Sequence, residues 1–189
     1  MSSPTQNKRG IRRISNRIFE MVLFAMFAAL MFCSKIILEA APNIHLLGTF
    51  VMLCTVVFRA KALIPLYLYV IIQGIYAGFA PWWIPYTYVW TVLWGMTMLI
   101  PKNIPKKIAM FVYPAVCALH GFAFGIIYAP GQALIYGFNF EQTLVWIAQG
   151  FYFDIIHGIS NIFTGMLILP LSELLKKLMR RSGRLRSAK

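Results

Sequence analysis

The chain has 189 residues, of which 60% are hydrophobic and only 12% are charged. A soluble domain of this size has too much surface to hide so many apolar side chains, whereas a bilayer is itself an apolar solvent. The net charge of +13 would suit a nucleic-acid binder, but the basic residues flank apolar stretches. Anionic membrane lipids are therefore the expected partner, and no nucleic acid is expected. The composition predicts an all-α integral membrane protein.

Six apolar stretches, in chain order, are candidates for membrane-spanning helices, which need about 20 residues each. The stretches are Ile18–Ala40, Ile44–Phe58, Ala62–Ala80, Tyr86–Ile100, Ile108–Tyr128 and Thr143–Leu169. The last one runs on to Leu175. The connection Ala129–Gln142 contains Pro130 and Gly131, so it is expected to be a loop. The sequence therefore predicts one bundle of six transmembrane helices.

The basic residues divide the connections into two kinds. All Lys and Arg residues except Lys35 lie in segment 1–17, in the second and fourth connections, or in the tail 176–189. With six spans, these segments share one side of the membrane, and the positive-inside rule makes that side cytoplasmic. We expect a basic cytoplasmic N-terminal segment 1–17, a transmembrane domain 18–175 and a basic cytoplasmic tail 176–189, in the plasma membrane.

The few polar residues within the spans are candidates for a solute-binding site, because such groups normally face protein, water or a partner. Lys35 and Glu39 lie one helical turn apart near the outer end of the first span. Asp154, His157 and Asn161 share one face of the last span. The remaining candidates lie in the first outer turn and in three other spans: Asn43, His45, Gln73, Trp90, Trp94 and His120.

Each group also has a purely structural interpretation. The Lys–Glu pair could reach the outer interface, the polar face of the last span could be a hydrogen-bond network, and the tryptophans could be packing residues. Asp154 and His157 could instead hold a metal with His120, or act as an acid–base pair. That interpretation is less favoured because the HExxH and GxSxG motifs are absent. We expect no metal, no cofactor and no catalytic residue.

The first span carries Ala25-x-x-x-Ala29, a small-residue face that permits close approach of another helix. With its size, its six predicted spans, the turn Pro42-Asn43-Ile44-His45 and the face Asp154-x-x-His157-x-x-x-Asn161, the chain resembles the substrate-binding S components of energy-coupling factor (ECF) transporters. The resemblance covers about residues 18–175.

The resemblance implies a specific function and a set of partners. The chain would bind a vitamin-like or other small micronutrient from outside and deliver it inward with a transmembrane coupling subunit and two ATPase subunits. Ala25 and Ala29 would contact the coupling subunit. The pocket would draw on the outer first loop and on the fourth, fifth and sixth helices. Aromatic, carboxylate and imidazole groups together would suit a flat, nitrogen-containing polar molecule.

Two other classes of function stay open from the sequence. A self-sufficient secondary transporter or channel would couple a small solute to protons through Asp154 and His157. An intramembrane enzyme would use the same pair on a lipid or peptide, although no nucleophile is evident beside it. The chain lacks a Gly-x-x-x-x-Gly-Lys phosphate loop, so it is not expected to hydrolyse ATP in that way itself.

Overall fold

The computed structural model describes residues 4–40 and 44–181, with side chains from residue 14 onward, and every regular element in these ranges is a helix. The elements are α1 (Pro4–Ile37), α2 (Leu47–Phe58), the short 3-10 helix η1 (Arg59–Ala62), α3 (Leu63–Ala77), α4 (Trp83–Met98), α5 (Lys106–Phe122), α6 (Phe124–Tyr136), α7 (Phe140–Gly165) and α8 (Ile168–Arg181). The predicted all-α class is confirmed.

Three stretches of the described chain are long and apolar enough to cross a membrane: Ile14–Ile37, Leu47–Ala77 and Lys106–Tyr136. The count becomes four when α7 and α8, which meet at a 42° bend, are taken as one broken span. The helices α2, α3 and α4 have only 12, 15 and 16 residues, fewer than a spanning helix needs. The helical membrane character is supported, while six separate spans and two cytoplasmic termini stay predictions.

The loop expected over Ala129–Gln142 is wrong. Helix α6 continues through Pro130 to Tyr136, and α7 already begins at Phe140. In an apolar environment the backbone must satisfy its own polar groups, so a helix persists through residues that would end it in water. Next to the proline, the Gly131 N–H donates to the hydroxyl of Tyr88 at 3.0 Å. This backbone donor therefore has a partner outside its own helix.

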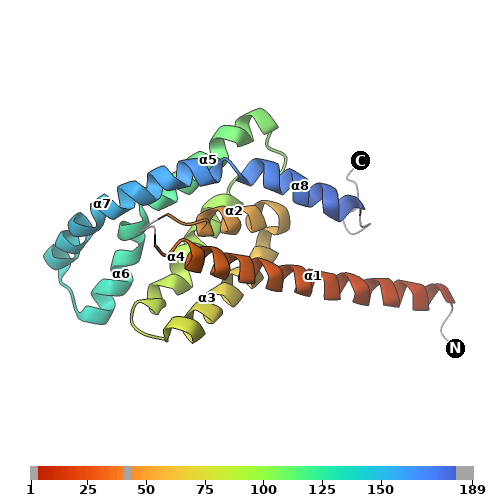
Figure 1. The fold of residues 1–189 in the computed structure, drawn as a ribbon, viewed down its shortest axis with the longest axis horizontal. Helices are drawn as coiled ribbons and strands as arrows, with labels where there is room; N and C mark the ends of the chain where they lie inside the picture. Colours follow the sequence, from red (N-terminus) through yellow and green to blue (C-terminus); the bar gives the residue numbers. More distant parts are fainter. Residues whose placement is uncertain (1–3, 41–43, 182–189) are drawn as a thin grey trace.

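The basic connections meet at one end of the bundle. The Lys61 ammonium of η1 pairs with Glu20 of α1 at 2.7 Å, and the Lys106 ammonium of α5 pairs with Glu173 of α8 at 2.6 Å. Arg59, which ends α2, donates to two carbonyl oxygens at the end of α4. The N-terminal half of α1 and the C-terminal half of α8 both extend toward the right of Figure 1. The second and fourth connections are therefore close together, and salt bridges join them to α1 and α8.

Helices α5 and α7 run side by side along the molecule (Figure 1), and glycines permit this approach. A Cβ added to Gly121 would lie 2.9 Å from the Cα of Gly158, and one added to Gly165 would lie 2.8 Å from the Cα of Pro114. Real Cβ atoms essentially never come this close to a backbone atom. The two backbones are thus in direct contact, and this contact fixes the position of the polar face of α7.

Candidate functional site

Five aromatic side chains from widely separated segments form one group, which we name the imidazole cluster: His45, Trp90, His120, Phe124 and His157. They come from the α1–α2 connection and from α4, α5, α6 and α7. The ring centroid of His45 lies 4.5 Å from that of His157 and 5.8 Å from that of Trp90. The Trp90 centroid lies 5.6 Å from that of His120. Phe124 closes the group, with its centroid 5.0 Å from that of His157 and 5.7 Å from that of Trp90.

Ring nitrogens in this cluster are buried without hydrogen-bond partners. Trp90, His120 and His157 are 1%, 0% and 1% exposed. Within the described part of the chain, no partner is found for His45 Nδ1, Trp90 Nε1, His120 Nδ1 or His157 Nε2. An unpaired buried polar atom costs about 1–3 kcal/mol, and folded proteins leave few of them. Four such atoms on neighbouring rings make this cluster the candidate site for a polar molecule.

The protonation of His120 follows from its second nitrogen. His120 Nε2 lies 3.1 Å from the carbonyl oxygen of Val89, and a carbonyl only accepts, so Nε2 carries the hydrogen. In a neutral imidazole the other nitrogen is then an acceptor. The indole nitrogen of Trp90 is always a donor. The cluster thus presents one fixed donor and one fixed acceptor on adjacent rings.

Asn161 extends the polar surface one helical turn beyond His157. Its Nδ2 donates to the carbonyl oxygen of Cys117 at 3.0 Å, and its Oδ1 has no partner. Because Cys117 O only accepts, this amide orientation is the chemically consistent one. The first turn of α2 also approaches this side chain, since a Cβ on Gly48 would lie 3.6 Å from Asn161 Nδ2. Asn161 Oδ1 is therefore a second fixed acceptor.

Asp154 lies one turn before His157 and is 6% exposed. Both carboxylate oxygens accept from the backbone N–H of Gly125, at 3.1 Å and 3.0 Å. Gly125 is in the first turn of α6, where N–H groups lack partners within the helix and a negative charge is favoured by the helix dipole. The carboxylate therefore caps α6 at the edge of the cluster. Its predicted role as a ligand contact stays a prediction, but the structure already gives the carboxylate a partner.

His45 lies in the connection between α1 and α2, between the apolar stretches Ile14–Ile37 and Leu47–Ala77, although the span expected from the sequence over Ile44–Phe58 includes it. Its pKa is lowered from 6.5 to about 4, first by burial and then by the proximity of His120 and Lys35. Burial disfavours the charged imidazolium. His45 is therefore neutral at physiological pH and brings no positive charge to the cluster.

The other predicted residues are distributed over the bundle. Gln73 is buried on α3 with Oε1 unpartnered, one turn from Tyr69, whose buried hydroxyl also lacks a partner among the described residues. Lys35 is half-buried and Glu39 is exposed, and no ion pair joins them in the described chain. Trp94 donates its indole N–H to the carbonyl oxygen of Arg59 at 3.2 Å. It therefore connects α4 with the start of η1, at the end of the bundle where the basic connections lie.

Two predicted surfaces remain. Asn43 lies outside the described residues. Ala25 and Ala29 are exposed on α1, on a face they share with Met21 and Met26, which are 70% and 49% exposed. The small-residue face is thus not used to pack the bundle.

Sequence reasoning misses two residues of the polar interior, although a signal for each exists. Phe124 follows His120 by four residues, and Tyr69 precedes Gln73 by four. This spacing places Tyr69 on the same face of α3 as Gln73, and it would do the same for Phe124 and His120 if the helix ran unbroken through Ala123. Both are ordinary apolar or aromatic residues in an apolar sequence, so nothing else distinguishes them.

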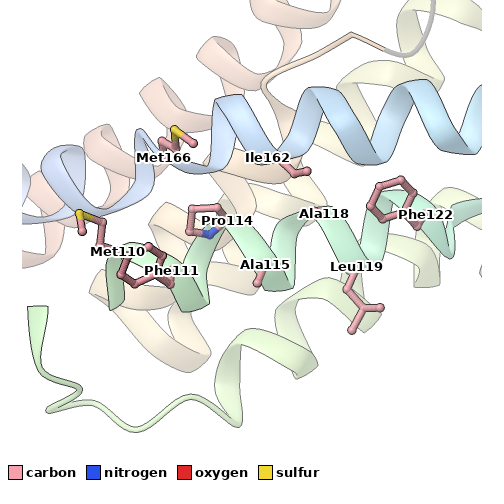
Figure 2. Close-up of a pocket in the computed structure, with 9 residues that line it drawn as sticks. All are labelled: Met110, Phe111, Pro114, Ala115, Ala118, Leu119, Phe122, Ile162 and Met166. Carbon is pink, nitrogen blue, oxygen red and sulfur yellow. The ribbon is translucent and has the colours of Figure 1, made fainter. Parts of the chain in front are cut away.

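An apolar groove of about 650 Å³ lies elsewhere, along α5 and α7 (Figure 2). Its lining is Met110, Phe111, Pro114, Ala115, Ala118, Leu119, Phe122, Ile162 and Met166. None of the predicted site residues lines it, and it offers no polar group for recognition. Over the described ranges, no three His, Cys, Asp or Glu side chains are arranged to hold a metal ion.

No protein-family model matches the chain. No curated protein and no solved structure matches it either. The function is therefore inferred from the residues themselves.

Proposed function

We propose that the chain is the substrate-capture (S) component of an ECF-type importer, which binds a vitamin-like or other small micronutrient from outside. It would deliver the substrate inward with a transmembrane coupling subunit and two ATPase subunits. The observation that carries the proposal is the imidazole cluster, in which four neighbouring ring nitrogens are left without partners. Binding sites for small molecules are mostly apolar and contain a few convergent polar groups of this kind.

The cluster favours binding over catalysis. A catalytic pair needs a free acid or base next to a nucleophile, but the Asp154 carboxylate is already hydrogen-bonded to Gly125. A nucleophile would have to be a residue such as Cys117, whose carbonyl oxygen accepts from Asn161. Its free thiol is buried in the core. We therefore propose no catalytic residue, no metal and no cofactor for this site.

The exposed face of α1 supports a protein partner. Ala25 and Ala29 lie there beside Met21, Val22 and Met26, and small residues let a second helix come close. We assign this face to the coupling subunit. We also propose six spans with both termini inside. The exposed basic residues Lys177, Arg180 and Arg181 of α8 would then lie against anionic lipid headgroups of the cytoplasmic leaflet.

Mass spectrometry of small molecules released from the purified protein tests the proposal. One compound should co-purify with the wild type, and Trp90→Phe should lose it while folding normally. Trp94→Phe is the matched control, since the same change is made one turn away at a residue outside the cluster. Uptake into vesicles should require the coupling subunit, the ATPases and ATP. Accumulation by this chain alone, without ATP, would contradict the proposal and favour a secondary transporter.

A further inference from the structure

The imidazole cluster specifies more than a polar ligand, because some of its hydrogen-bonding roles are fixed. Trp90 Nε1 donates, whereas His120 Nδ1 and Asn161 Oδ1 accept, as argued above from their other contacts. His45 Nδ1 and His157 Nε2 can take either role, depending on the tautomer. A molecule that satisfies the fixed groups must carry at least one acceptor and at least one donor.

The rings of the cluster carry no charge of their own, and the charged groups nearest to it, Lys35 and Asp154, lie at its margin. The carboxylate of Asp154, the one acidic group in the described part of α7 that reaches the cluster's edge, already accepts twice from Gly125. Lys35 and Glu39 lie at the end of α1, half-buried and exposed respectively. A buried charge needs an opposite charge or several hydrogen bonds to be tolerated. The rings themselves therefore offer hydrogen bonds and no opposite charge, which favours an uncharged group among them.

The surrounding surface also favours a flat group. Three of the four nitrogens belong to imidazoles and one to an indole, and Phe124 completes the lining with a ring 5.7 Å from Trp90 and 5.0 Å from His157. Aromatic rings offer faces and edges that pack well against another planar ring. The ring centroids of Trp90 and His120 are 5.6 Å apart, so a donor and an acceptor belong to neighbouring rings.

We propose that the part of the substrate held by the imidazole cluster is an uncharged planar ring whose edge carries a hydrogen-bond donor beside an acceptor. Lactam and ureido rings have this edge, in which a carbonyl oxygen neighbours an N–H. The carbonyl accepts from Trp90 Nε1, and the N–H donates to His120 Nδ1. This inference rests on the proposed function and narrows it to a class of substrate.

Equilibrium dialysis of the full chain in lipid nanodiscs tests the inference with hypoxanthine and 1-methylhypoxanthine. Both are uncharged planar lactams near neutral pH, but the methyl group removes the ring N–H beside the carbonyl. Hypoxanthine should bind, and the methylated compound should bind at least roughly tenfold more weakly, because a buried acceptor is then left unpaired. Thiamine, which carries a fixed positive charge, and benzoate, which is an anion, should not bind to the cluster.

A substitution at His120 tests the hydrogen bond to its ring acceptor separately from the shape of the site. In His120→Phe the planar ring is kept, while both ring nitrogens, including the acceptor, are lost. The preference for hypoxanthine over its methyl derivative should shrink to about threefold or less. If this variant fails to fold, Trp90→Phe serves instead, with hypoxanthine compared with purine, which lacks the carbonyl. Removing the indole donor should abolish that preference.

The outcomes distinguish this inference from the proposed function. Equal binding of the two hypoxanthines, stronger binding of thiamine or benzoate, or a co-purified ligand without a donor–acceptor edge overturns the inference and leaves the S-component proposal intact. The inference also fails when hypoxanthine, lumazine and 2-imidazolidone all fail to displace the co-purified compound. A preparation that contains and binds no small molecule at all overturns both.

Discussion

The contact between Asp154 and Gly125 permits a sharp test of how α6 is held. Asp154→Ala removes the acceptor for the Gly125 N–H, which is then buried and unpaired. Hydrogen bonds to a charged group contribute about 1.5–3 kcal/mol, and loss of an N-terminal cap costs typically about 1 kcal/mol. We expect the variant to be about 2 kcal/mol less stable. For a chain of this length, that is a fall in thermal midpoint of about 4–8 °C.

Gly125→Ala should have a similar effect by a different route. A Cβ on Gly125 would lie 2.4 Å from Asp154 Oδ2, so the carboxylate must leave its position. Gly150→Ala on α7 is the matched control, because nothing lies within 4 Å of its added Cβ. Alanine also favours a helix over glycine by roughly 1 kcal/mol, so this control should be as stable as the wild type or more stable.

The double variant Asp154→Ala/Gly125→Ala tests whether the two residues act through the same contact. Once Asp154→Ala has removed the carboxylate, the methyl group introduced by Gly125→Ala no longer meets it, so the second change should cost little. The two effects should therefore fail to add, with a coupling of about 2 kcal/mol, as for residues in direct contact. Thermal unfolding of the purified protein in detergent, followed by intrinsic fluorescence, measures all four proteins. Additive effects, or a wild-type midpoint for Asp154→Ala with ligand binding lost, would refute the capping role and return Asp154 to the substrate site.

Three further predictions concern packing, partners and pH. Gly121→Ala should lower the thermal midpoint by the equivalent of about 1–3 kcal/mol of overpacking against the backbone of α7, whereas Gly95→Ala, which faces open space, should not. Ala29→Trp should leave ligand binding unchanged and abolish co-purification of the coupling subunit, and Ile75→Trp, at another exposed site, should keep it. The thermal midpoint should fall as the pH is lowered from 6.5 to about 4, because the unfolded chain then binds a proton that folded His45 excludes. In His45→Gln this slope should be shallower, and an unchanged slope would count against the burial of that imidazole.

The helical class follows directly from the sequence, because apolar stretches of this length have few other stable structures in a bilayer. Helix ends are harder to predict. The loop prediction rests on Pro130 and the glycines after it, and it overlooks the capping box of Asn139 and Gln142 that begins α7. Gly137, whose left-handed backbone ends α6, is counted there as a loop residue. The break at Ala123 has no such local signal. The N–H of Gly125, just after the break, donates to a carboxylate that lies 29 residues further along the chain.

The polar interior could be predicted in part. Helical periodicity places His157 and Asn161 on one face, and predicted depth in the membrane suggests that His120 lies opposite. The same reasoning cannot tell Trp90, which lies in the cluster, from Trp94, which donates to Arg59. Both share one stripe of α4, and only the packing of the neighbouring helices distinguishes them. Sequence reasoning likewise cannot show that the carboxylate of Asp154 accepts from the backbone N–H of Gly125.

On the proposed topology, Arg59 would serve two stages in the life of a membrane protein. During insertion, its charge is one of those that would retain the second connection on the cytoplasmic side. After folding, its guanidinium donates to Met98 O at 2.6 Å and to Ile100 O at 3.2 Å, at the negative end of α4, from a backbone with φ of 55°. A charge engaged in this way is no longer free to attract lipid. The same residue would then act both as a topology signal and as a contact within the fold. A neutral replacement at this position would weaken the topology signal and also remove the hydrogen bonds to the end of α4.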